Sequence, residues 1–511
     1  MSQFDIESTA AVAAEADFDP FAAGLIEQTL PSTEPQREVW LADQLGAQAS
    51  LAYSESLTLR LQGAVDTQAI AAAFSALVAR HQSLRSTFSA DGSLLLVGEA
   101  APIDLALRDL SPLDEATQAR TLAQECAAAV REPFVLERGP LLRATLYRLS
   151  PDAHCLVMTA HHAVCDGWSW GVIADELGQL YAEQIGAGPA LDPAPRYADY
   201  QAWESAEAAG PAMQSHVDYW LKQFAGSSLP VLELPLDRPR PAVRTFASQR
   251  IDHLLDSNLL DGLRKTGAGV GASLYAVLFS GFAALLHRLT AQEDLVVGIA
   301  AAGQLASNMP RLVGHCVNLL PLRVAVDAAL PFEALIRQSS GLLLDGVEHQ
   351  NLAYGALLRK LPMARDASRL PLVSVLFNVD RDAAPGRGTF PGIDAAQGSV
   401  ARAFENFELF VNIVPAAGGM QVELQYNTDL FDHATIERWL RIYETLLRAA
   451  AADPALAVGR LELRGAEDAH ALRALRPAAT APVGARLMHA AFAPRQRPSR
   501  TARRYAAPTR C

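Results

Sequence analysis

Two adjacent histidines followed by an aspartate are the residues of this chain best suited to proton chemistry. They stand in the run His161-His162-Ala163-Val164-Cys165-Asp166-Gly167-Trp168-Ser169. A neutral imidazole has a pKa near ~6.5, so a histidine can accept or release a proton at neutral pH. The run follows an apolar, strand-like segment, residues 155–160, and successive side chains of a strand point to opposite faces. We therefore expect one histidine to face a cleft and the other to face the core.

The residues after the histidines suit the shaping of a loop. Asp166 is expected to turn back and pair with a buried cation, and Gly167 permits a tight turn or a close approach to a substrate. The alternative is a pair of core histidines followed by an aspartate that caps a helix. The whole pattern HHxxxDGWS at a junction between a strand and a helix favours the functional interpretation. The sequence has neither GxSxG nor a GxGxxG after a strand, which disfavours a serine hydrolase or a dinucleotide enzyme.

Helical and extended patterns alternate on both sides of this run, which predicts a mixed α/β fold. Asp66 is expected to cap a helix that ends at His81, and Asp91–Gly92 to turn a hairpin over 84–98. In the first half we also expect helices over 113–131 and 168–184 and strands over 141–149 and 154–160. In the second half we expect helices over 272–290, 331–349 and 433–451 and strands over 294–301, 316–326, 371–380 and 406–415.

Composition changes divide the chain into five parts. We expect a mobile leader or docking segment over 1–30, a first α/β half over 31–225, a proline-rich linker over 226–245, a second half over 246–465 and a tail over 466–511. Residues 471–511 hold nine arginines and no Asp, Glu or Lys. This tail is either a basic solvated extension or the product of a shifted reading frame.

Composition and charge exclude several classes of protein. Half of the 511 residues are hydrophobic, 19% are charged, and the net charge is −13. An acidic surface argues against nucleic acid or an anionic membrane as the main partner. The five cysteines show neither a CxxC pair nor metal-ligand spacing, which fits a reducing cytoplasm without disulfides or a metal site. The acidic N-terminus is unlike a signal peptide, and the most apolar stretch, 274–286, is too short to span a bilayer.

Together with six other segments, the HHxxxDGWS run resembles the condensation domain of nonribosomal peptide synthetases, a relative of chloramphenicol acetyltransferase. These segments are TEPQREVWL (33–41), RHQSLRSTF (80–88), YADYQAW (197–203), VGHCVNLLPLR (313–323), and His349-Gln350 with RDASRLPL (365–372). They follow the order of the family's motifs. Departures include Pro35 for Ala, Glu38 for Arg and Cys316 for Phe.

The resemblance implies two chloramphenicol acetyltransferase-like lobes forming a V, with a central tunnel and His162 at its midpoint. The amine of a carrier-bound aminoacyl group would attack an acyl or peptidyl thioester and form an amide. His162 would accept the proton or position the amine, and His161 would support it structurally. Asp166 would shape the loop, with Arg323 as its ion-pair partner, and the Gly167 N–H would face the developing oxyanion.

Other side chains of these segments are expected to play structural roles. Arg85 and Arg369 are expected to be partners in ion pairs, and Asn318 to satisfy the backbone of a neighbouring loop. We expect Trp40, Phe88, Tyr197 and Trp203 to pack in the core. Trp168, Ser169 and Asn318 are candidates for the tunnel or the interface between the lobes.

The resemblance also implies partners. No cofactor is bound directly, because the substrates travel on the phosphopantetheine of acyl or peptidyl carrier proteins, or on CoA. An adenylation domain of the same assembly line would be a further partner, and the tail could be its truncated or frame-shifted start. No nucleic acid or membrane is expected, and the location would be cytoplasmic.

The subtype rests on weaker signals. The segment Glu405–Asn412 and the short stretch before the first motif favour a starter or polyketide-hybrid domain, while the absence of DxxxxD disfavours a heterocyclising one. Two alternatives remain open. One is a starter-type N-acyltransferase that uses acyl-CoA, and the other is a non-catalytic recruitment module of the same fold.

Overall fold

The structure is a computed structural model that describes residues 25–226, 229–363, 366–380 and 390–465. The chain divides into two compact units, Met1–Leu461 and Glu462–Cys511, and every element named below lies in the first. The arginine-rich tail expected over 466–511 lies outside the described residues.

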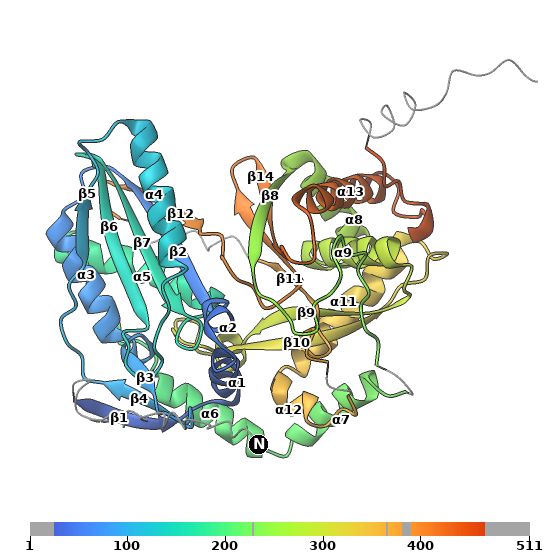
Figure 1. Ribbon diagram of the computed structural model, residues 1–511, viewed down its shortest axis with the longest axis horizontal. Helices are drawn as coiled ribbons and strands as arrows, with labels where there is room; N and C mark the ends of the chain where they lie inside the picture. Colours follow the sequence, from blue (N-terminus) through green and yellow to red (C-terminus); the bar gives the residue numbers. More distant parts are fainter. Residues whose placement is uncertain (1–24, 227–228, 364–365, 381–389, 466–511) are drawn as a thin grey trace, which may run out of the picture. The chain divides into compact units, whose positions relative to one another are not determined.

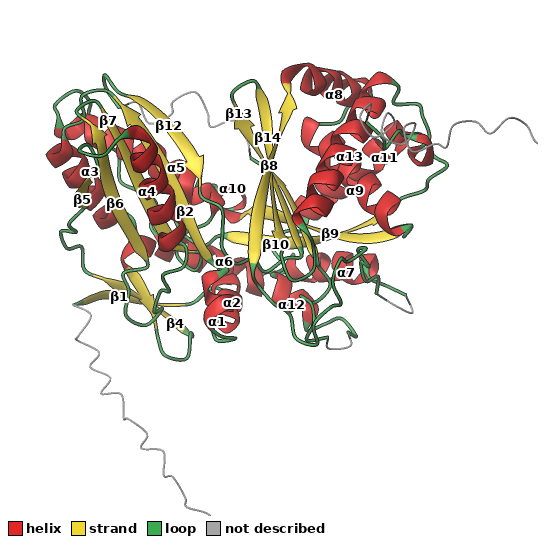
Figure 2. Cartoon of the chain, turned by 45° about the horizontal axis from the view of Figure 1, so that its top comes forward, coloured by secondary structure: helices red, strands yellow, loops and turns green. Residues whose placement is uncertain are grey.

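The first sheet carries the histidine run at the end of one of its central strands. Its order is β12 (Asp394–Ser399), β2 (Ser54–Gln62), β7 (Ala153–His161), β6 (Leu142–Ser150) and β5 (Ala106–Asp109). Strands β2, β7 and β6 are antiparallel neighbours. Helices α3 (Thr67–Arg80) and α5 (Gly167–Gln184) pack on the face that holds Leu156 and Met158. Helix α4 (Glu115–Ala129) covers the face of Cys155 and Val157, as strand alternation requires (Figure 2).

A second sheet is built from the later part of the chain. Its order is β10 (Val317–Ala325), β9 (Asp294–Ala302), β11 (Val375–Val379), β13 (Leu409–Ala416), β14 (Gly419–Asn427) and β8 (Ser248–Asp256). Helices α8 (Ser257–Gly269), α9 (Leu274–Thr290), α11 (Phe332–Glu348) and α13 (His433–Ala452) gather beside it (Figure 2). Phe377 of β11 is fully buried against the rings of Phe279 and Phe282 of α9. Aromatic packing therefore fastens this helix layer to the sheet.

Shorter elements complete the first unit. A three-stranded sheet has the order β1 (Ile26–Pro31), β4 (Leu94–Gly98) and β3 (Ser86–Phe88). The remaining helices are α1 (Glu34–Asp43), α2 (Ala47–Leu51), α6 (Tyr197–Ala209), α7 (Met213–Gln223), α10 (Gly303–Ala306), α12 (Tyr354–Leu358) and the 3-10 turns Gln82–Arg85 and Val458–Arg460. Because residues 26–31 pair with β4, the expected leader of 1–30 is wrong for its last five residues.

The position of strand β12 shows that the expected division of the chain into two halves at one linker is wrong. Its residues lie in the range 246–465, yet they pair with β2 in the first sheet (Figure 1). The chain then returns to the second sheet as β13. Sequence order therefore does not separate the two sheets, and residues 400–408 connect them. No helix or strand is found among residues 229–245, where the linker was expected.

The helices and strands expected from the sequence are present, with small shifts at their ends. The Asp66 carboxylate accepts the backbone N–H groups of Gln68 and Ala69 and so begins α3. Gly92 turns the β3–β4 hairpin with a φ of 67°, which a residue without a side chain adopts at low cost.

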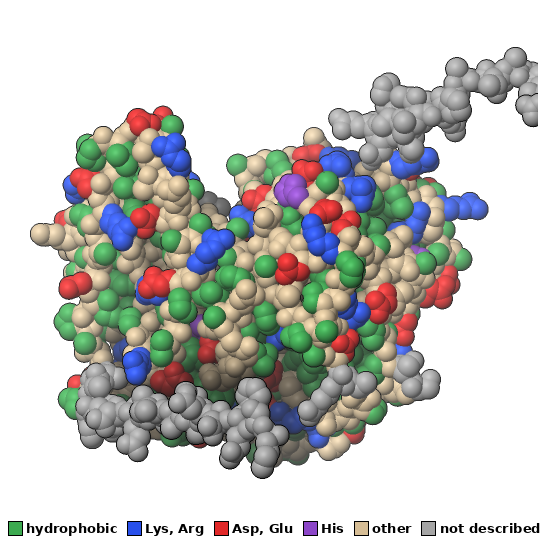
Figure 3. Space-filling model, viewed as in Figure 1, with side chains coloured by type: hydrophobic (Ala, Val, Ile, Leu, Met, Phe, Trp, Pro, Cys, Tyr) green, Lys and Arg blue, Asp and Glu red, His purple; other side chains and the backbone are tan. Residues whose placement is uncertain are grey.

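Among the described residues, no single helix is long and apolar enough to span a membrane. The helices α8 and α9, which are bent against each other, reach that length and composition only when taken together. On the face shown in Figure 3, acidic and basic side chains are interspersed.

We expect Phe377→Ala to destabilise the protein by about 3–5 kcal/mol, because it opens a cavity among the aromatic rings of α9. Differential scanning calorimetry should show a melting temperature lowered by several degrees. Val243→Ala, at a side chain that is 65% exposed, is the matched control and should melt like the parent protein. Equal melting temperatures for both variants would show that this aromatic layer does not limit stability.

Candidate active site

The two histidines lie where β7 ends and the chain turns towards α5. The His161 N–H still donates to the Leu141 carbonyl, and the His162 N–H donates to the Tyr53 carbonyl at 2.8 Å. The His161 side chain is fully buried, while that of His162 is 17% exposed. Alternation at the strand end thus separates a core histidine from one that reaches a polar environment.

His161 is held inside the loop and against α1. Its Nδ1 accepts the Ala163 N–H at 3.2 Å, so the proton of the neutral ring lies on Nε2. That nitrogen is 3.6 Å from Oδ1 of Asp43. Burial lowers the pKa of His161, which keeps the ring neutral. These contacts support the structural role that we expect for it.

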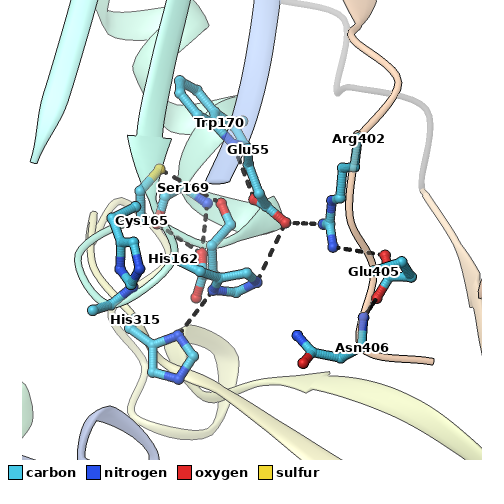
Figure 4. Close-up of polar contacts among 12 residues, drawn as sticks. Glu55, His162, Cys165, Ser169, Trp170, His315, Arg402, Glu405 and Asn406 are labelled. Atoms are coloured by element: carbon cyan, nitrogen blue, oxygen red, sulfur yellow. Dashed lines mark hydrogen bonds and ion pairs between the residues drawn. The ribbon is translucent and has the colours of Figure 1, made fainter. Parts of the chain in front are cut away.

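His162 lies between two titratable side chains (Figure 4). Its Nδ1 is 3.1 Å from Nδ1 of His315, and its Nε2 is 3.3 Å from Oε1 of Glu55. The two imidazole rings meet edge to face, with centroids 5.0 Å apart. Each ring nitrogen of His162 therefore lies near a polar side chain of the protein.

Glu55 is a buried carboxylate that the sequence analysis did not single out. Its Oε2 accepts the indole N–H of Trp170 at 3.2 Å, and its Oε1 pairs with the Arg402 guanidinium. Arg402 also contacts the buried Glu405, 3.1 Å away. Burial alone would raise the pKa of Glu55, but the charges of His162 and Arg402 outweigh it and lower the pKa. The sequence signal that could have identified Glu55 is a charged residue in the otherwise neutral first part of β2.

His315 is the second side chain that sequence reasoning missed. It precedes β10, in a segment noted for its family resemblance rather than for this histidine. The side chain is almost fully buried. Burial, and next the neighbouring His162, hold the pKa of His315 well below its usual range. His315 is therefore neutral at neutral pH.

Asp166 fastens the loop, but not through Arg323 as expected. Its carboxylate accepts the backbone N–H and hydroxyl of Ser169, the side-chain amide of Gln304, and the backbone N–H of Cys316 at 2.9 Å. Asp166 is thus the N-cap of α5 and binds Gln304 of α10 and Cys316, the residue before β10. Neutral donors satisfy the carboxylate, so no buried cation is needed.

Arg323 lies elsewhere and has a different partner. It forms a two-pronged ion pair with Asp294 on the adjacent strand, with Nη2 2.7 Å from Oδ2. Hydrogen bonding to Asp294 raises the pKa of Arg323. The expected Asp166–Arg323 pair is wrong. Asp166 contacts Cys316 just before β10 begins, whereas Arg323 lies near the other end of β10 and faces Asp294 of β9.

The other expected ion pairs are present. Arg85 binds Glu27 at 2.6 Å and the Gly98 carbonyl. Arg369 binds Glu233 and, at 3.4 Å, Asp366. Both arginines are structural partners, as predicted.

Contacts of Trp168 and Ser169 join the loop to the later part of the chain. The Trp168 indole N–H donates to the Pro310 carbonyl at 2.8 Å. The Ser169 hydroxyl oxygen accepts the Gly314 N–H at 3.0 Å. A Cβ on Gly314 would lie 2.3 Å from the Tyr197 ring, so only glycine allows this approach. Trp168 and Ser169 thus contact the later part of the chain, while their place in a tunnel or at the interface between the lobes stays a prediction.

Asn318 performs the structural role expected of it. Its amide donates to the carbonyls of Gln350 and Leu352 and accepts the Tyr354 N–H, which holds the loop before α12. The aromatic residues of the motifs pack as expected. Phe88 and Tyr197 belong to one buried cluster, and the partly buried Trp40 and Trp203 pack against it.

Asp166→Ala should act mainly through stability. It removes a helix cap, worth about 0.5–2 kcal/mol, and leaves buried donors unsatisfied at about 1–3 kcal/mol each. Asp114→Ala removes only the exposed cap of α4, where the carboxylate accepts the Thr117 N–H, and serves as the matched control. Thermal unfolding should rank the variants parent, Asp114→Ala, Asp166→Ala. An Asp166→Ala protein that melts like the parent yet is inactive would instead make Asp166 a direct participant in the reaction.

His315 should make the fold sensitive to acid. Its pKa is lower in the folded protein than the ~6.5 of an unfolded chain, so the unfolded state binds the proton first as the pH falls. Stability should therefore fall as the pH is lowered through about 6.5, and less steeply in His315→Gln. Chemical unfolding at several pH values between about 7.5 and 5 measures this. Parallel curves for the two proteins would contradict it.

Comparisons with known proteins agree with this architecture. The condensation domain family model matches residues 26–472. Chondramide synthase cmdD of Chondromyces crocatus is 33% identical over 447 residues, which cover 87% of this chain and 11% of that protein. The chain spans only 11% to 18% of the length of the first curated relatives.

Solved structures show the same fold. The condensation domain of the monacolin K polyketide synthase MokA superposes with a TM-score of 0.76 at 19% identity, covering 85% of this chain and all of that one. A four-domain nonribosomal peptide synthetase, holo-AB3403 bound to AMP and glycine, contains a matching part with a TM-score of 0.74 at 19% identity, covering 86% of this chain and 34% of that one. The expected α/β fold of the chloramphenicol acetyltransferase type is confirmed. With the family model matched over most of its length, the chain belongs to the condensation domain family.

Proposed function

We propose that this chain joins an acyl or peptidyl thioester to the amine of a carrier-bound aminoacyl group. The observation that carries the proposal is the partly exposed His162 at the end of β7, held between His315 and Glu55 in a chain of the condensation domain family. The amine nitrogen attacks the donor carbonyl carbon, the C–S bond breaks, and an amide and a free thiol form. The proton lost by the amine ends on the thiolate.

His162 is the proposed group for the proton transfer or for positioning the amine. General acid–base assistance is typically worth about 10²–10⁴-fold in rate. Holding two tethered substrates in reacting geometry supplies a further part of the barrier reduction. Neither contribution requires a covalent bond to the protein.

Gly167 is the proposed donor to the developing oxyanion. It is the first residue of α5, and the first N–H groups of a helix lack intrahelical partners. Gly167 is exposed, and a Cβ built on it would meet no atom within 4 Å. In this proposal the N–H of Gly167 would meet a substrate oxygen at the positive end of the helix dipole.

Phosphopantetheine arms of carrier proteins are the proposed source of both substrates. The chain matches only part of a chondramide synthase and part of a four-domain synthetase, which favours carrier and adenylation domains as partners. For the donor we propose a fatty-acyl or polyketide-derived chain. The segment Glu405–Asn412 supports this choice, because it resembles the corresponding segment of subtypes that take such donors.

His162→Ala should lower amide formation by at least about 10²-fold with little effect on folding. His253→Ala is the matched control. His253 is also a partly exposed histidine beside a glutamate, with Nε2 2.7 Å from Oε2 of Glu444, but it lies on β8. The rate is measured by mass spectrometry of the acceptor carrier under single-turnover conditions. Turnover of His162→Ala close to that of His253→Ala would refute the role of His162.

A comparison of a carrier-bound donor with a CoA-bound donor distinguishes the proposed function from its two alternatives. A carrier-bound donor should react much faster than the same acyl group on CoA. The reverse preference would indicate the acyl-CoA-dependent N-acyltransferase, and no amide from either donor would favour the recruitment module.

A further inference from the structure

A small pocket in the later part of the chain is lined by three arginines, Arg240, Arg244 and Arg369, and by the amide side chain of Asn406. We call it the arginine pocket. Its empty space, with the solvent at its mouth included, is about 340 Å³. Its walls come from the segment before β8, the segment before β11 and the segment that leads into β13. Segments far apart in the sequence thus bring three guanidinium groups to one place.

Carboxylates neutralise two of these arginines but not the third. Arg240 forms a two-pronged ion pair with Glu408, with nitrogen–oxygen distances of 2.7 and 3.0 Å. Arg369 pairs with Glu233. Among the residues that the structure describes, no carboxylate lies within ion-pair distance of Arg244, and the charges that act on it come from tyrosines. The arginine pocket therefore has one uncompensated positive charge, at Arg244.

The Arg244 guanidinium is partly enclosed and incompletely hydrogen-bonded. It lies over the ring of Phe246, 4.8 Å from the ring centre. Burial lowers the pKa of Arg244, which shows that its charge is poorly solvated there. Its Nη1 is buried and has no hydrogen-bond partner among the described residues. An anion in the pocket would accept a hydrogen bond from this nitrogen and offset the cost of burying the charge.

Tyr53 connects the arginine pocket to His162. Its backbone carbonyl accepts the His162 N–H at 2.8 Å, and the ring centres of Tyr53 and His162 are 6.3 Å apart. Burial raises the pKa of Tyr53 to about 12, and the charge of Arg244 opposes that increase. Tyr53 is therefore a direct neighbour of His162 and also lies within the electrostatic reach of Arg244.

Asn406 belongs both to the arginine pocket and to the surroundings of His162. It lines the pocket, and Figure 4 shows its side chain directed from its segment towards the two histidines. Its Oδ1 is buried and accepts no hydrogen bond from the described residues. An amide oxygen can only accept, so it suits a ligand with an N–H group. The pocket thus offers an acceptor for an amine at Asn406 and a cationic donor for an anion at Arg244.

We propose that the arginine pocket binds the side-chain carboxylate of an acidic acceptor, with Arg244 as its partner and the acceptor amine beside Asn406 and His162. The proposal rests on the proposed function, which supplies a carrier-bound aminoacyl group as the acceptor. The acceptor class is an aminoacyl group with an ionised side-chain carboxylate, as in aspartate or glutamate. One uncompensated positive charge matches one carboxylate. Arg244 is then a specificity-determining residue that takes no part in bond formation.

Phosphate is the competing anion, because every carrier arm has one. It lies at the opposite end of the pantetheine chain from the thioester. The arginine pocket, in contrast, shares Tyr53 with His162. When the aminoacyl thioester lies at His162, the phosphate of the same arm is a whole pantetheine length away. A side-chain carboxylate lies only a few bonds from the amine, so it fits the position of this pocket better.

Aminoacyl pantetheine amides, in which an amide replaces the thioester, test the pocket without turnover. Aspartyl and asparaginyl amides have nearly the same shape and differ in charge, and so do glutamyl and glutaminyl amides. Calorimetry with the full chain should show at least about tenfold tighter binding of the charged member in one of the two pairs, as expected for a hydrogen bond to a charged group. Equal affinity within both pairs would overturn the proposal.

Three variants assign the preference to Arg244. Arg244→Met removes the charge and should abolish the preference while leaving the affinity for the uncharged amides unchanged. Arg244→Lys keeps the charge and should retain part of the preference, which a purely structural role of Arg244 would not produce. Arg288→Met is the matched control, because Arg288 is also a partly buried arginine, which donates to the carbonyls of Val458 and Leu461. A preference that survives in Arg244→Met, or that Arg288→Met also removes, refutes the proposal.

Phosphorylated forms of the same compounds distinguish the two anions. The phosphopantetheine amides should show the same charge preference as the unphosphorylated ones, and Arg244→Met should again remove it. If Arg244→Met instead weakens every phosphorylated compound alike and leaves the unphosphorylated ones unaffected, the pocket binds the phosphate of the arm. That result would show the proposal to be wrong.

Single-turnover assays with acceptor carriers that bear the same four aminoacyl groups separate this inference from the proposed function. If the parent protein binds a charged compound preferentially through Arg244 but forms no amide, the pocket assignment stands and the proposed function fails. If the parent forms amides at equal rates with the charged and uncharged members of both pairs and binds them equally, the function stands and the role of Arg244 is refuted.

Discussion

The hydrogen bonds of the Asp166 carboxylate are the interaction on which the site depends. One buried anion caps α5, accepts the Gln304 amide and accepts the Cys316 N–H, so it joins the loop after β7 to the start of β10. Because His315 directly precedes Cys316, the same contact brings His315 to His162. The full set of donors offsets part of the cost of burying this carboxylate, and the loss of any one of them would leave that cost uncompensated. The loop is therefore fixed by complete hydrogen bonding rather than by a salt bridge.

A second connection between the sheets runs through the crossing segment. Strand β12 pairs with β2, and the residues that follow it carry Arg402 to Glu55, beside His162. The imidazole is thus held by one residue on each side, His315 from the segment before β10 and Glu55 from β2. Both partners depend on segments that are distant in the sequence. The surroundings of His162 therefore depend on residues outside the HHxxxDG run as well.

Local patterns were enough to predict much of this structure. Apolar periodicity predicted the helices α3, α5 and α9, and Gly92 predicted the turn of the β3–β4 hairpin. The type and spacing of His162 and Asp166 indicated the site. Strand β12 was missed because its sequence, DAAQGS, is short and largely exposed, and it becomes a strand only by pairing with β2. Glu55 and His315 were missed for a similar reason, since neither has a partner within its own segment. The predicted Asp166–Arg323 pair was wrong, because the negative charge of Asp166 suggested a cation as its partner. The fold instead supplies backbone and side-chain amide donors.

The central claim is that His162 assists direct transfer of an acyl group from one carrier arm to an amine on another, without a covalent bond to this chain. Time-resolved mass spectrometry of all three intact proteins during a single turnover measures this most directly. The acyl mass should leave the donor carrier and appear on the acceptor carrier at the same rate, while the mass of this chain stays constant. Transient addition of the acyl mass to this chain, before any appears on the acceptor, would contradict the account.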